Sequence, residues 1–146
     1  MYHVLMPIDD DESRVRSQID AVLDLQQAGD ELLVDVLHVY EEIDVPADEA
    51  GSSTIDRINE NLADLQGLPD TADHAAETLR EAGIETAIHD VVGDPAPAIA
   101  DVAAEYDVDS IVVGAKRRSP VGKAVFGSVA QAVILGADRP VLVAAP

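Results

Sequence analysis

SIVVGAKRRSPVGKAVFGSV, residues 110–129, joins an apolar run to the start of a helix through a basic loop. Residues 111–113 are Ile-Val-Val, a run typical of a strand that is buried on both faces, and Gly114 ends it. The loop that follows contains four of the nine basic residues of the chain: Lys116, Arg117, Arg118 and Lys123. Because the formal net charge of the chain is -20, this concentration of positive charge indicates an anionic ligand or an acidic surface that the loop meets.

The end of this stretch predicts the N-terminus of a helix. Gly127 and Ser128 come first, and either residue can cap the helix. Val129, Ala132 and Val133 follow at helical spacing. The first backbone N–H groups of a helix have no partner within it, and glycine lets a ligand approach the main chain. Together with the serine hydroxyl, these groups predict a binding site for an anion, for which phosphate is the natural candidate.

The length and composition indicate one domain, residues 1–146. A chain of 146 residues with 47% hydrophobic residues is long enough for one core and too short for two comfortable ones. The absence of cysteine excludes disulfides, thiolate catalysis and cysteine-bound metals. No stretch approaches the length of a membrane-spanning helix, and residues 1–7 lack the basic start of a signal peptide. We therefore expect a cytoplasmic protein.

The acidic excess is extreme, with 29 acidic residues against 9 basic ones. Mutual repulsion of these charges weakens a compact state at low salt, whereas near molar salt the screening length falls to about 3 Å. This balance favours the cytoplasm of a salt-accumulating halophile over the alternative, an acidic protein from an ordinary cell. We expect no nucleic-acid or membrane partner, because such partners require a basic face and the chain has one small basic loop.

Apolar runs and helical patterns alternate along the chain. Strands are expected at residues 2–8, 32–40, 84–92, 108–114 and 141–144, and helices within residues 11–29, 55–83, 94–106 and 128–136. The second helical pattern continues through Pro69, so a kink or break is expected near residues 66–69, and residues 41–54 predict a surface loop. The alternation predicts an α/β fold, a three-layer α/β/α sandwich with a parallel sheet wrapped by helices on both sides.

Ligands of such a sheet bind outside the carboxyl ends of the strands, where the winding direction switches. Asp9 and Gly114, at the ends of the first and fourth strands, are expected to flank that crevice. Asp9, Asp10 and Asp11 stand where a dinucleotide-binding domain carries its glycine-rich loop, which excludes the usual NAD site. Asp10 and Asp11 are most simply explained as helix caps. Asp9 is expected to contact a ligand through ribose hydroxyls, an adenine amino group or a Mg²⁺ that a nucleotide carries.

Catalytic and metal-binding patterns are not evident in the sequence, so metal ligands stay unassigned. The four histidines are scattered over the expected strands and one helix without metal-ligand spacing: His3, His38, His74 and His89. Ser128 has no neighbouring base that would make it a nucleophile. A phosphoryl-accepting receiver domain has a similar sheet, but it requires a lysine at the end of the fifth strand, where this chain ends Ala-Ala-Pro.

These residues resemble the universal stress protein family along the full length of the chain. The resemblance runs from Pro7-x-Asp9 at the end of the first strand to RPVLV, residues 139–143. Members of the family that bind ATP carry the pattern Gly-x2-Gly-x9-Gly-[Ser/Thr] after the fourth strand. Gly114 matches the first glycine, and Gly127 with Ser128 matches the last pair. Arg117 replaces the middle glycine.

The resemblance implies a five-stranded sheet of order 3-2-1-4-5, which is adenine nucleotide alpha hydrolase-like and Rossmann-like. It implies a homodimer, for which the edge strand at residues 140–145 is the expected interface. It also implies binding of ATP, or of ADP or AMP, with or without Mg²⁺. The residues that it places around the adenosine are Pro7, Ile8, Asp9 and Val39. Those that it places around the phosphates are Gly114, Ala115, Lys116, Arg117, Arg118, Gly127, Ser128 and Val129.

The arginine at position 117 leaves two possibilities open. Its guanidinium can bind the phosphate oxygens that a glycine backbone would otherwise hold, or its bulk can block the site. If it binds, we expect a nucleotide-binding sensor or regulator of the stress response with at most slow ATP hydrolysis, because no residue is an evident base for activating water. The alternative function is a dimeric interaction module of the same fold that binds no nucleotide and docks a partner protein on its basic loop.

Overall fold

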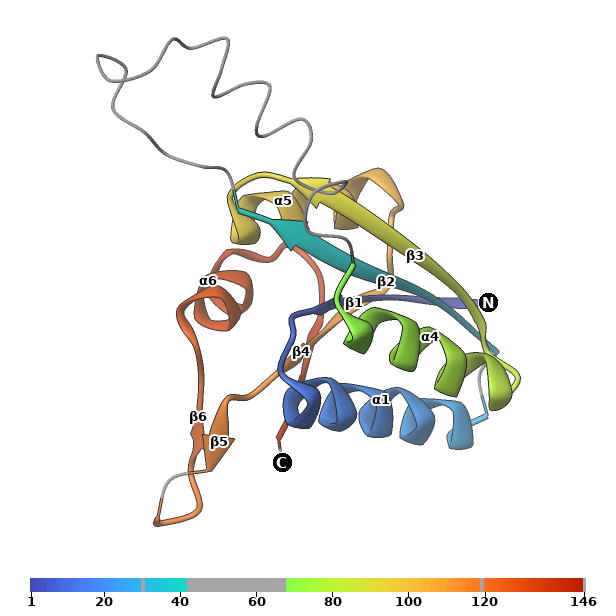
Figure 1. The fold of residues 1–146 in the computed structure, drawn as a ribbon, viewed down its shortest axis with the longest axis horizontal. Helices are drawn as coiled ribbons and strands as arrows, with labels where there is room; N and C mark the ends of the chain where they lie inside the picture. Colours follow the sequence, from blue (N-terminus) through green and yellow to red (C-terminus); the bar gives the residue numbers. More distant parts are fainter. Residues whose placement is uncertain (30, 42–67, 119, 146) are drawn as a thin grey trace, which may run out of the picture.

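The computed structural model describes residues 1–29, 31–41, 68–118 and 120–145, with the backbone alone at Arg117 and Arg118. Strands and helices alternate along these residues (Figure 1). In chain order they are β1 (Tyr2–Ile8), α1 (Glu12–Gln27), β2 (Leu32–Tyr40), α4 (Asp70–Glu81), β3 (Glu85–Val92), α5 (Pro95–Glu105), β4 (Ser110–Gly114), β5 (Arg117–Arg118), β6 (Ala124–Val125), α6 (Ser128–Gly136) and β7 (Val141–Ala144).

Five parallel strands form the central sheet, in the order β3-β2-β1-β4-β7. This order confirms the predicted α/β class and the order 3-2-1-4-5. Strand β1 pairs with β2 on one side and with β4 on the other, so the winding direction of the sheet switches between β1 and β4. Strand β7 pairs with β4 from Ile111 opposite Val141 to Gly114 opposite Ala144 and lies at the edge of the sheet.

Helices cover both faces of the sheet and produce the three predicted layers. Helices α1 and α4 lie on one face, and α5 and α6 lie on the other (Figure 1). Along β1, Val4 and Met6 belong to the core beneath α1 and α4, whereas Leu5 belongs to the core beneath α5 and α6. Successive side chains of a strand point to opposite faces. Because both faces are dry, the central strands appear in the sequence as continuous apolar runs.

The helix boundaries follow their capping residues. Asp11 caps α1, since its carboxylate accepts a hydrogen bond from the backbone N–H of Arg14 at 3.0 Å, which confirms the capping prediction for this aspartate. Gly29 follows α1 with a φ of +107°, a left-handed conformation that favours glycine. Pro69 is the N-cap of α4, so this helix begins after the proline and does not run through it. The expected helical residues before 68 and the expected loop at 42–54 lie outside the described residues.

One element differs from the predictions. Strands β5 and β6 pair in antiparallel fashion, with Arg117 opposite Val125 and Arg118 opposite Ala124, and form a two-stranded ribbon within the segment that was expected as a loop (Figure 1). The backbone N–H of Lys116 donates to the carbonyl of Val125 at 2.7 Å and extends this pairing. A strand of two residues gives no periodic signal in the sequence, which explains why the ribbon was not predicted.

Candidate functional site

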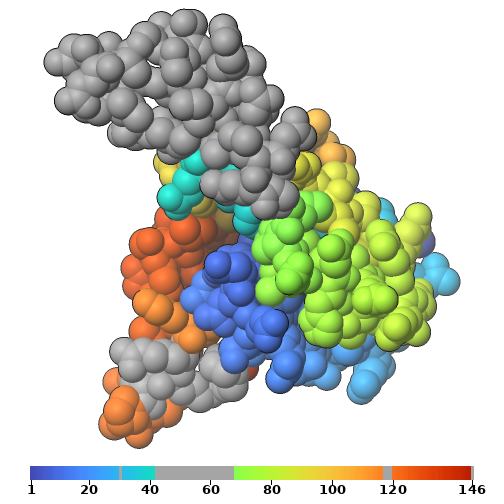
Figure 2. All heavy atoms as spheres, in the orientation of Figure 1, coloured from blue at the N-terminus to red at the C-terminus, as the bar shows by residue number. Residues whose placement is uncertain are grey.

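A cavity of about 410 Å³ lies at the carboxyl ends of β1, β2 and β4. Its remaining walls come from Arg14 of α1, from Glu41 and Lys116 in the connecting segments, and from the first two turns of α5 and α6. Figure 2 shows the surface hollowed between the orange atoms of α6 and the blue atoms at the beginning of the chain. The cavity therefore lies at the switch between β1 and β4, where the fold predicts a ligand, and its size is typical of small-molecule sites.

Most of the predicted binding residues come together around this cavity, although they come from four separate parts of the chain. Those that line it are Pro7, Ile8, Asp9, Val39, Gly114, Lys116, Gly127, Ser128 and Val129.

The three other predicted binding residues do not contribute side chains to the described lining. Ala115 is buried, with 1% of its surface exposed, and its N–H donates to the carbonyl of Ala144 at 2.8 Å, so this residue extends the pairing of β4 with β7. Arg117 and Arg118 contribute backbone to β5, and their side chains lie outside the described part of the structure. The two possibilities for the guanidinium at position 117 therefore both stay predictions.

The N-terminus of α6 borders the cavity. Gly127 is the N-cap and Ser128 is the first helical residue, which decides between the two predicted caps. The N–H of Gln131 donates to the carbonyl of Gly127 at 3.1 Å, so the N–H groups of residues 128–130 precede the first hydrogen bond of the helix. A Cβ on Gly127 would meet no described atom within 4 Å, so packing within the protein does not require glycine there. This is the arrangement of backbone that binds anions at the start of a helix.

Arg14 is a lining residue that the sequence analysis missed. A Cβ built on Gly114 would overlap the Cγ atom of Arg14 and would lie 3.0 Å from its Cδ atom. The aliphatic part of Arg14 therefore fills the space beside Gly114, and the packing of this arginine requires the glycine. No pattern along the chain indicates the contact, because α1 and the end of β4 are far apart in the sequence.

The guanidinium of Arg14 forms an ion pair with Asp9. Its Nη1 atom donates to Oδ2 of Asp9, and its Nη2 atom lies 4.0 Å from Oδ2 of Asp11. The other oxygen of Asp9, Oδ1, accepts a hydrogen bond from the N–H of Asp11 at 3.1 Å. The carboxylate of Asp9 is therefore held at both oxygens and its charge is compensated, while 40% of the side chain stays exposed.

His38 of β2 lines the same cavity and was predicted only as an ordinary strand histidine. Burial lowers the pKa of His38 below its usual 6.5, and this effect outweighs the opposite influence of Asp90, Asp10 and Asp9. The imidazole is therefore neutral at pH 7. Its ring packs edge-on against Tyr40, with 4.5 Å between the ring centroids. A neutral aromatic wall suits an uncharged, flat part of a ligand.

The other walls of the cavity divide into an apolar and a polar part. Leu37, Ile99, Val113 and Val133 are buried and provide apolar surface. Lys116 and Ser128 are exposed and provide polar groups on the side of the ribbon and α6, and Glu41, which follows β2, adds an exposed carboxylate. A cavity with this division suits a ligand that combines a flat ring with an anionic group.

Metal-ligand clusters and membrane-spanning helices are both absent from the described residues. Within the described ranges, no three His, Cys, Asp or Glu side chains come together as metal ligands. The described helices also include none that is long and apolar enough to cross a membrane.

Comparisons with known proteins agree with this architecture. A model of the universal stress protein family matches residues 1–145. A universal stress protein of Mycolicibacterium smegmatis is 35% identical over 69 residues, which are 47% of this chain and 53% of that relative, so the chain spans about half the length of that curated relative.

Solved structures are similar over nearly the whole chain. A universal stress protein from Archaeoglobus fulgidus is 30% identical with a TM-score of 0.67, covering 98% of both chains. A structure of the universal stress protein from Archaeoglobus fulgidus in complex with dAMP is 25% identical with a TM-score of 0.63, covering 98% of this chain and 97% of that one. Since the family match extends from the first strand to the last, the chain belongs to the universal stress protein family.

Proposed function

We propose that this chain binds an adenine nucleotide, ATP, ADP or AMP, in the cavity between β1 and β4 and acts as a sensor or regulator in the stress response. The observation that carries the proposal is the lining of the cavity, which joins buried apolar walls to the N-terminus of α6 and to Lys116 in a chain of net charge -20. A related structure that contains dAMP supports an adenine ligand.

In the proposed mode of binding, the adenosine lies against Pro7, Ile8, Asp9 and Val39. An ionised carboxylate only accepts hydrogen bonds, so Asp9 suits the hydroxyl groups of a ribose. The phosphates extend toward residues 114–118 and 127–129, where a lysine and the first N–H groups of α6 attract negative charge. Ala115 takes part only through its backbone, because its side chain is buried.

Regulation, with at most slow hydrolysis, is the proposed role. Any Mg²⁺ would arrive with the nucleotide phosphates, since the carboxylate of Asp9 is already paired with Arg14. Basic groups and backbone donors around a triphosphate can stabilise transferring phosphate, but fast turnover also requires a group that positions or activates water. We assign that task to no residue of this cavity.

Isothermal titration in molar KCl tests the proposal. The expected result is binding of ATP, ADP and AMP, with GTP bound more weakly because the apolar wall is proposed to take adenine. Absence of heat with all three adenine nucleotides at millimolar concentration would refute nucleotide binding, provided that circular dichroism shows a folded protein under the same conditions.

Arg117→Gly, which restores the family pattern, separates the two possible roles of this side chain. If the guanidinium binds phosphate, the affinity for ATP falls or stays level in the variant. If its bulk blocks the site, the affinity rises. Adenosine serves as the control ligand, because it has no phosphate for the guanidinium to contact.

A dimeric interaction module without a ligand is the second candidate function. Both candidate functions include a homodimer, which the edge strand β7 favours: 36% of Leu142 is exposed there, and Leu135 of α6 is 86% exposed. We propose that residues 140–145 pair with a second copy of the chain. Light scattering after gel filtration tests this: the wild type is expected at twice the monomer mass, and Leu142→Glu is expected to shift it toward the monomer. A monomeric wild type would rule the dimer out.

The setting of the protein is also proposed. We infer a cytoplasmic location in a salt-accumulating halophile because the chain has 29 acidic residues and only 9 basic ones. The same excess of negative charge is expected to make folding depend on the salt concentration, which can be tested by removing the salt.

A further inference from the structure

The guanidinium of Arg14 lies in the cavity beside Asp9 and compensates the negative charge of that carboxylate. We propose that Arg14 makes the cavity select phosphorylated adenine compounds over adenosine. The inference deepens the proposed function and rests on it. Arg14 lies outside the glycine pattern of residues 114–128, so the assignment depends on the contacts of its side chain.

Asp9 creates a problem for any phosphorylated ligand. Its carboxylate suits a ribose, but a carboxylate and a phosphate within one cavity repel each other. The ion pair with Nη1 of Arg14 compensates the charge of Asp9 and still leaves 40% of the side chain exposed. The pair therefore lets the carboxylate meet the sugar while the cavity accepts the phosphate.

The guanidinium also keeps hydrogen-bond donors that no described group satisfies. An arginine carries five N–H donors. The Nε atom of Arg14 is buried and has no hydrogen-bond partner among the described residues. Its Nη2 atom lies 4.0 Å from the carboxylate of Asp11, which is too far for a hydrogen bond. Because the side chain is 23% exposed and lines the cavity, the Nη2 group can donate a charge-assisted hydrogen bond to an anion that enters it.

The position of this cation is fixed before a ligand arrives. The aliphatic part of Arg14 packs on the backbone at Gly114. Any side chain at position 114 would occupy the space that Arg14 fills. The side chain is 23% exposed and therefore keeps access to the cavity that it lines. A cation that is already in place loses little conformational freedom on binding, so its interaction appears in the affinity for phosphate.

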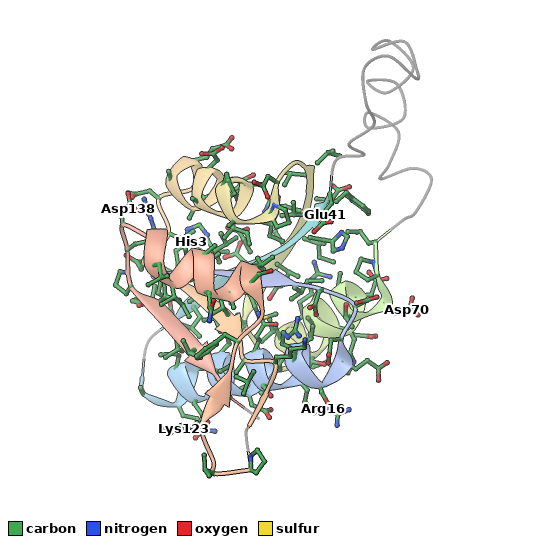
Figure 3. The ribbon with its side chains drawn as sticks, turned by 90° about the vertical axis from the view of Figure 1, so that its left-hand side faces the viewer. His3, Arg16, Glu41, Asp70, Lys123 and Asp138 are labelled. Atoms are coloured by element: carbon green, nitrogen blue, oxygen red, sulfur yellow. The ribbon has the colours of Figure 1, made fainter. Side chains whose placement is uncertain are left out.

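Arg14→Gln, Arg14→Lys and a matched control, Arg16→Gln, test the proposal by isothermal titration with ATP, AMP and adenosine in molar KCl. Arg16 belongs to the same helix, but it is exposed and points away from the body of the molecule (Figure 3), so its replacement changes the net charge equally without touching the cavity. In Arg14→Gln we expect the affinities for ATP and AMP to fall about tenfold or more, as for loss of a charged hydrogen bond, and adenosine to change less than about twofold.

The other variants give the expected contrast. Arg14→Lys keeps the charge and is expected to recover part of the affinity for phosphate, and Arg16→Gln is expected to match the wild type. The double variant Asp9→Asn with Arg14→Gln removes the repelling carboxylate, so it is expected to bind AMP more tightly than Arg14→Gln alone. Thermal unfolding of each variant confirms that the comparisons are made on folded protein.

The results separate this inference from the proposed function. A wild type that binds none of the three ligands overturns both. A wild type that binds ATP, with an Arg14→Gln variant that binds all three ligands as tightly, overturns the role of Arg14 alone. An equal loss for adenosine and ATP, or a gain for ATP, also overturns it, because the arginine would then be a structural support or an obstruction.

Discussion

A glycine beside a binding cavity can be required by the ligand or by the protein, and the two glycines of this cavity differ in that respect. Gly114 leaves room for the stem of Arg14, whereas a Cβ on Gly127 would meet no described atom within 4 Å. Both residues match glycines of the family pattern, so the sequence alone does not distinguish them. The structure assigns a packing reason to Gly114 and leaves none for Gly127.

Gly114→Ala is expected to lower the free energy of unfolding by about 1–3 kcal/mol, as for an overpacked core, because the added methyl group overlaps Arg14. Urea denaturation in molar KCl measures the change. In an Arg14→Ala background the same substitution should cost much less, since the obstructing stem is gone. Gly136→Ala is the control, because a Cβ there meets no described atom within 4 Å, and this substitution is expected to leave the stability unchanged or to raise it slightly. Equal costs in the two backgrounds would contradict the contact.

His38 gives the stability a dependence on pH. Burial lowers its pKa in the folded protein below 6.5, so the unfolded chain binds the proton first as the pH falls. The contribution of the neutral imidazole is therefore fully present above pH 6.5 and is lost progressively below it. His38→Gln should lose less stability than the wild type between about pH 7.5 and 5.5, as measured by urea denaturation at each pH. Parallel curves for the two proteins would show that this histidine does not contribute.

At the scale of elements, the strands and helices could be predicted well and the contacts between them could not. Continuous apolar runs predicted the buried strands, and capping residues such as Asp11 predicted where helices begin. The strand order came from the family resemblance. The ribbon β5–β6 is too short to leave a pattern. Arg14 was missed because a polar residue on an amphipathic helix is expected to face solvent, so the sequence gives no reason to look for a partner on β4. Only the fold brings Arg14 and Gly114 together.

Asp35 connects three strands of the sheet. Its side chain is 7% exposed, and its carboxylate pairs with Nε2 of His3 from β1 and, at 2.7 Å, with Nε2 of His89 from β3. A carboxylate can accept a hydrogen bond at each of its oxygens, and here one oxygen faces each imidazole. Polar contacts that cross from strand to strand in this way are costly to interrupt, because the partly buried imidazoles lose their carboxylate partner.

Asp35→Ala is therefore expected to destabilise the protein by about 1–3 kcal/mol, which urea denaturation at pH 7 measures. Asp90→Asn is the matched control, because Asp90 lies on the neighbouring strand β3 with its side chain exposed, and its replacement should change the stability by less than about 0.5 kcal/mol. If both variants unfold at the same urea concentration as the wild type, the pairing across the strands contributes nothing to stability.

At the scale of the whole molecule, the net charge of -20 acts on every element at once. The core is divided into two layers of buried aliphatic side chains, which favour the compact state, while the surface charges oppose it. Composition predicted this conflict directly, since it requires no knowledge of which residues meet. The location of the cavity was also predictable, because it follows from strand order alone.

Lowering the salt concentration is expected to unfold the protein. At about 0.1 M salt the screening length is about 10 Å, so surface carboxylates of neighbouring elements repel one another, whereas near 1 M the screening length falls to about 3 Å. Far-UV circular dichroism during dialysis from molar KCl to about 0.1 M should show loss of helix, and return of salt should restore it. Sucrose at matched osmotic strength is the control, since it carries no charge. A spectrum that does not change with salt would contradict the halophilic assignment.

The ribbon β5–β6 gives this protein a convenient point of attachment for a reporter. Val121 lies between the two short strands and is 78% exposed, and the cavity lining does not include it. Because the chain contains no cysteine, Val121→Cys introduces a unique thiol to which a fluorophore can be coupled. The two strands of the ribbon would connect the dye to Lys116 and Gly127, which line the cavity. A change in its emission during titration would therefore report ligand binding without a label inside the cavity.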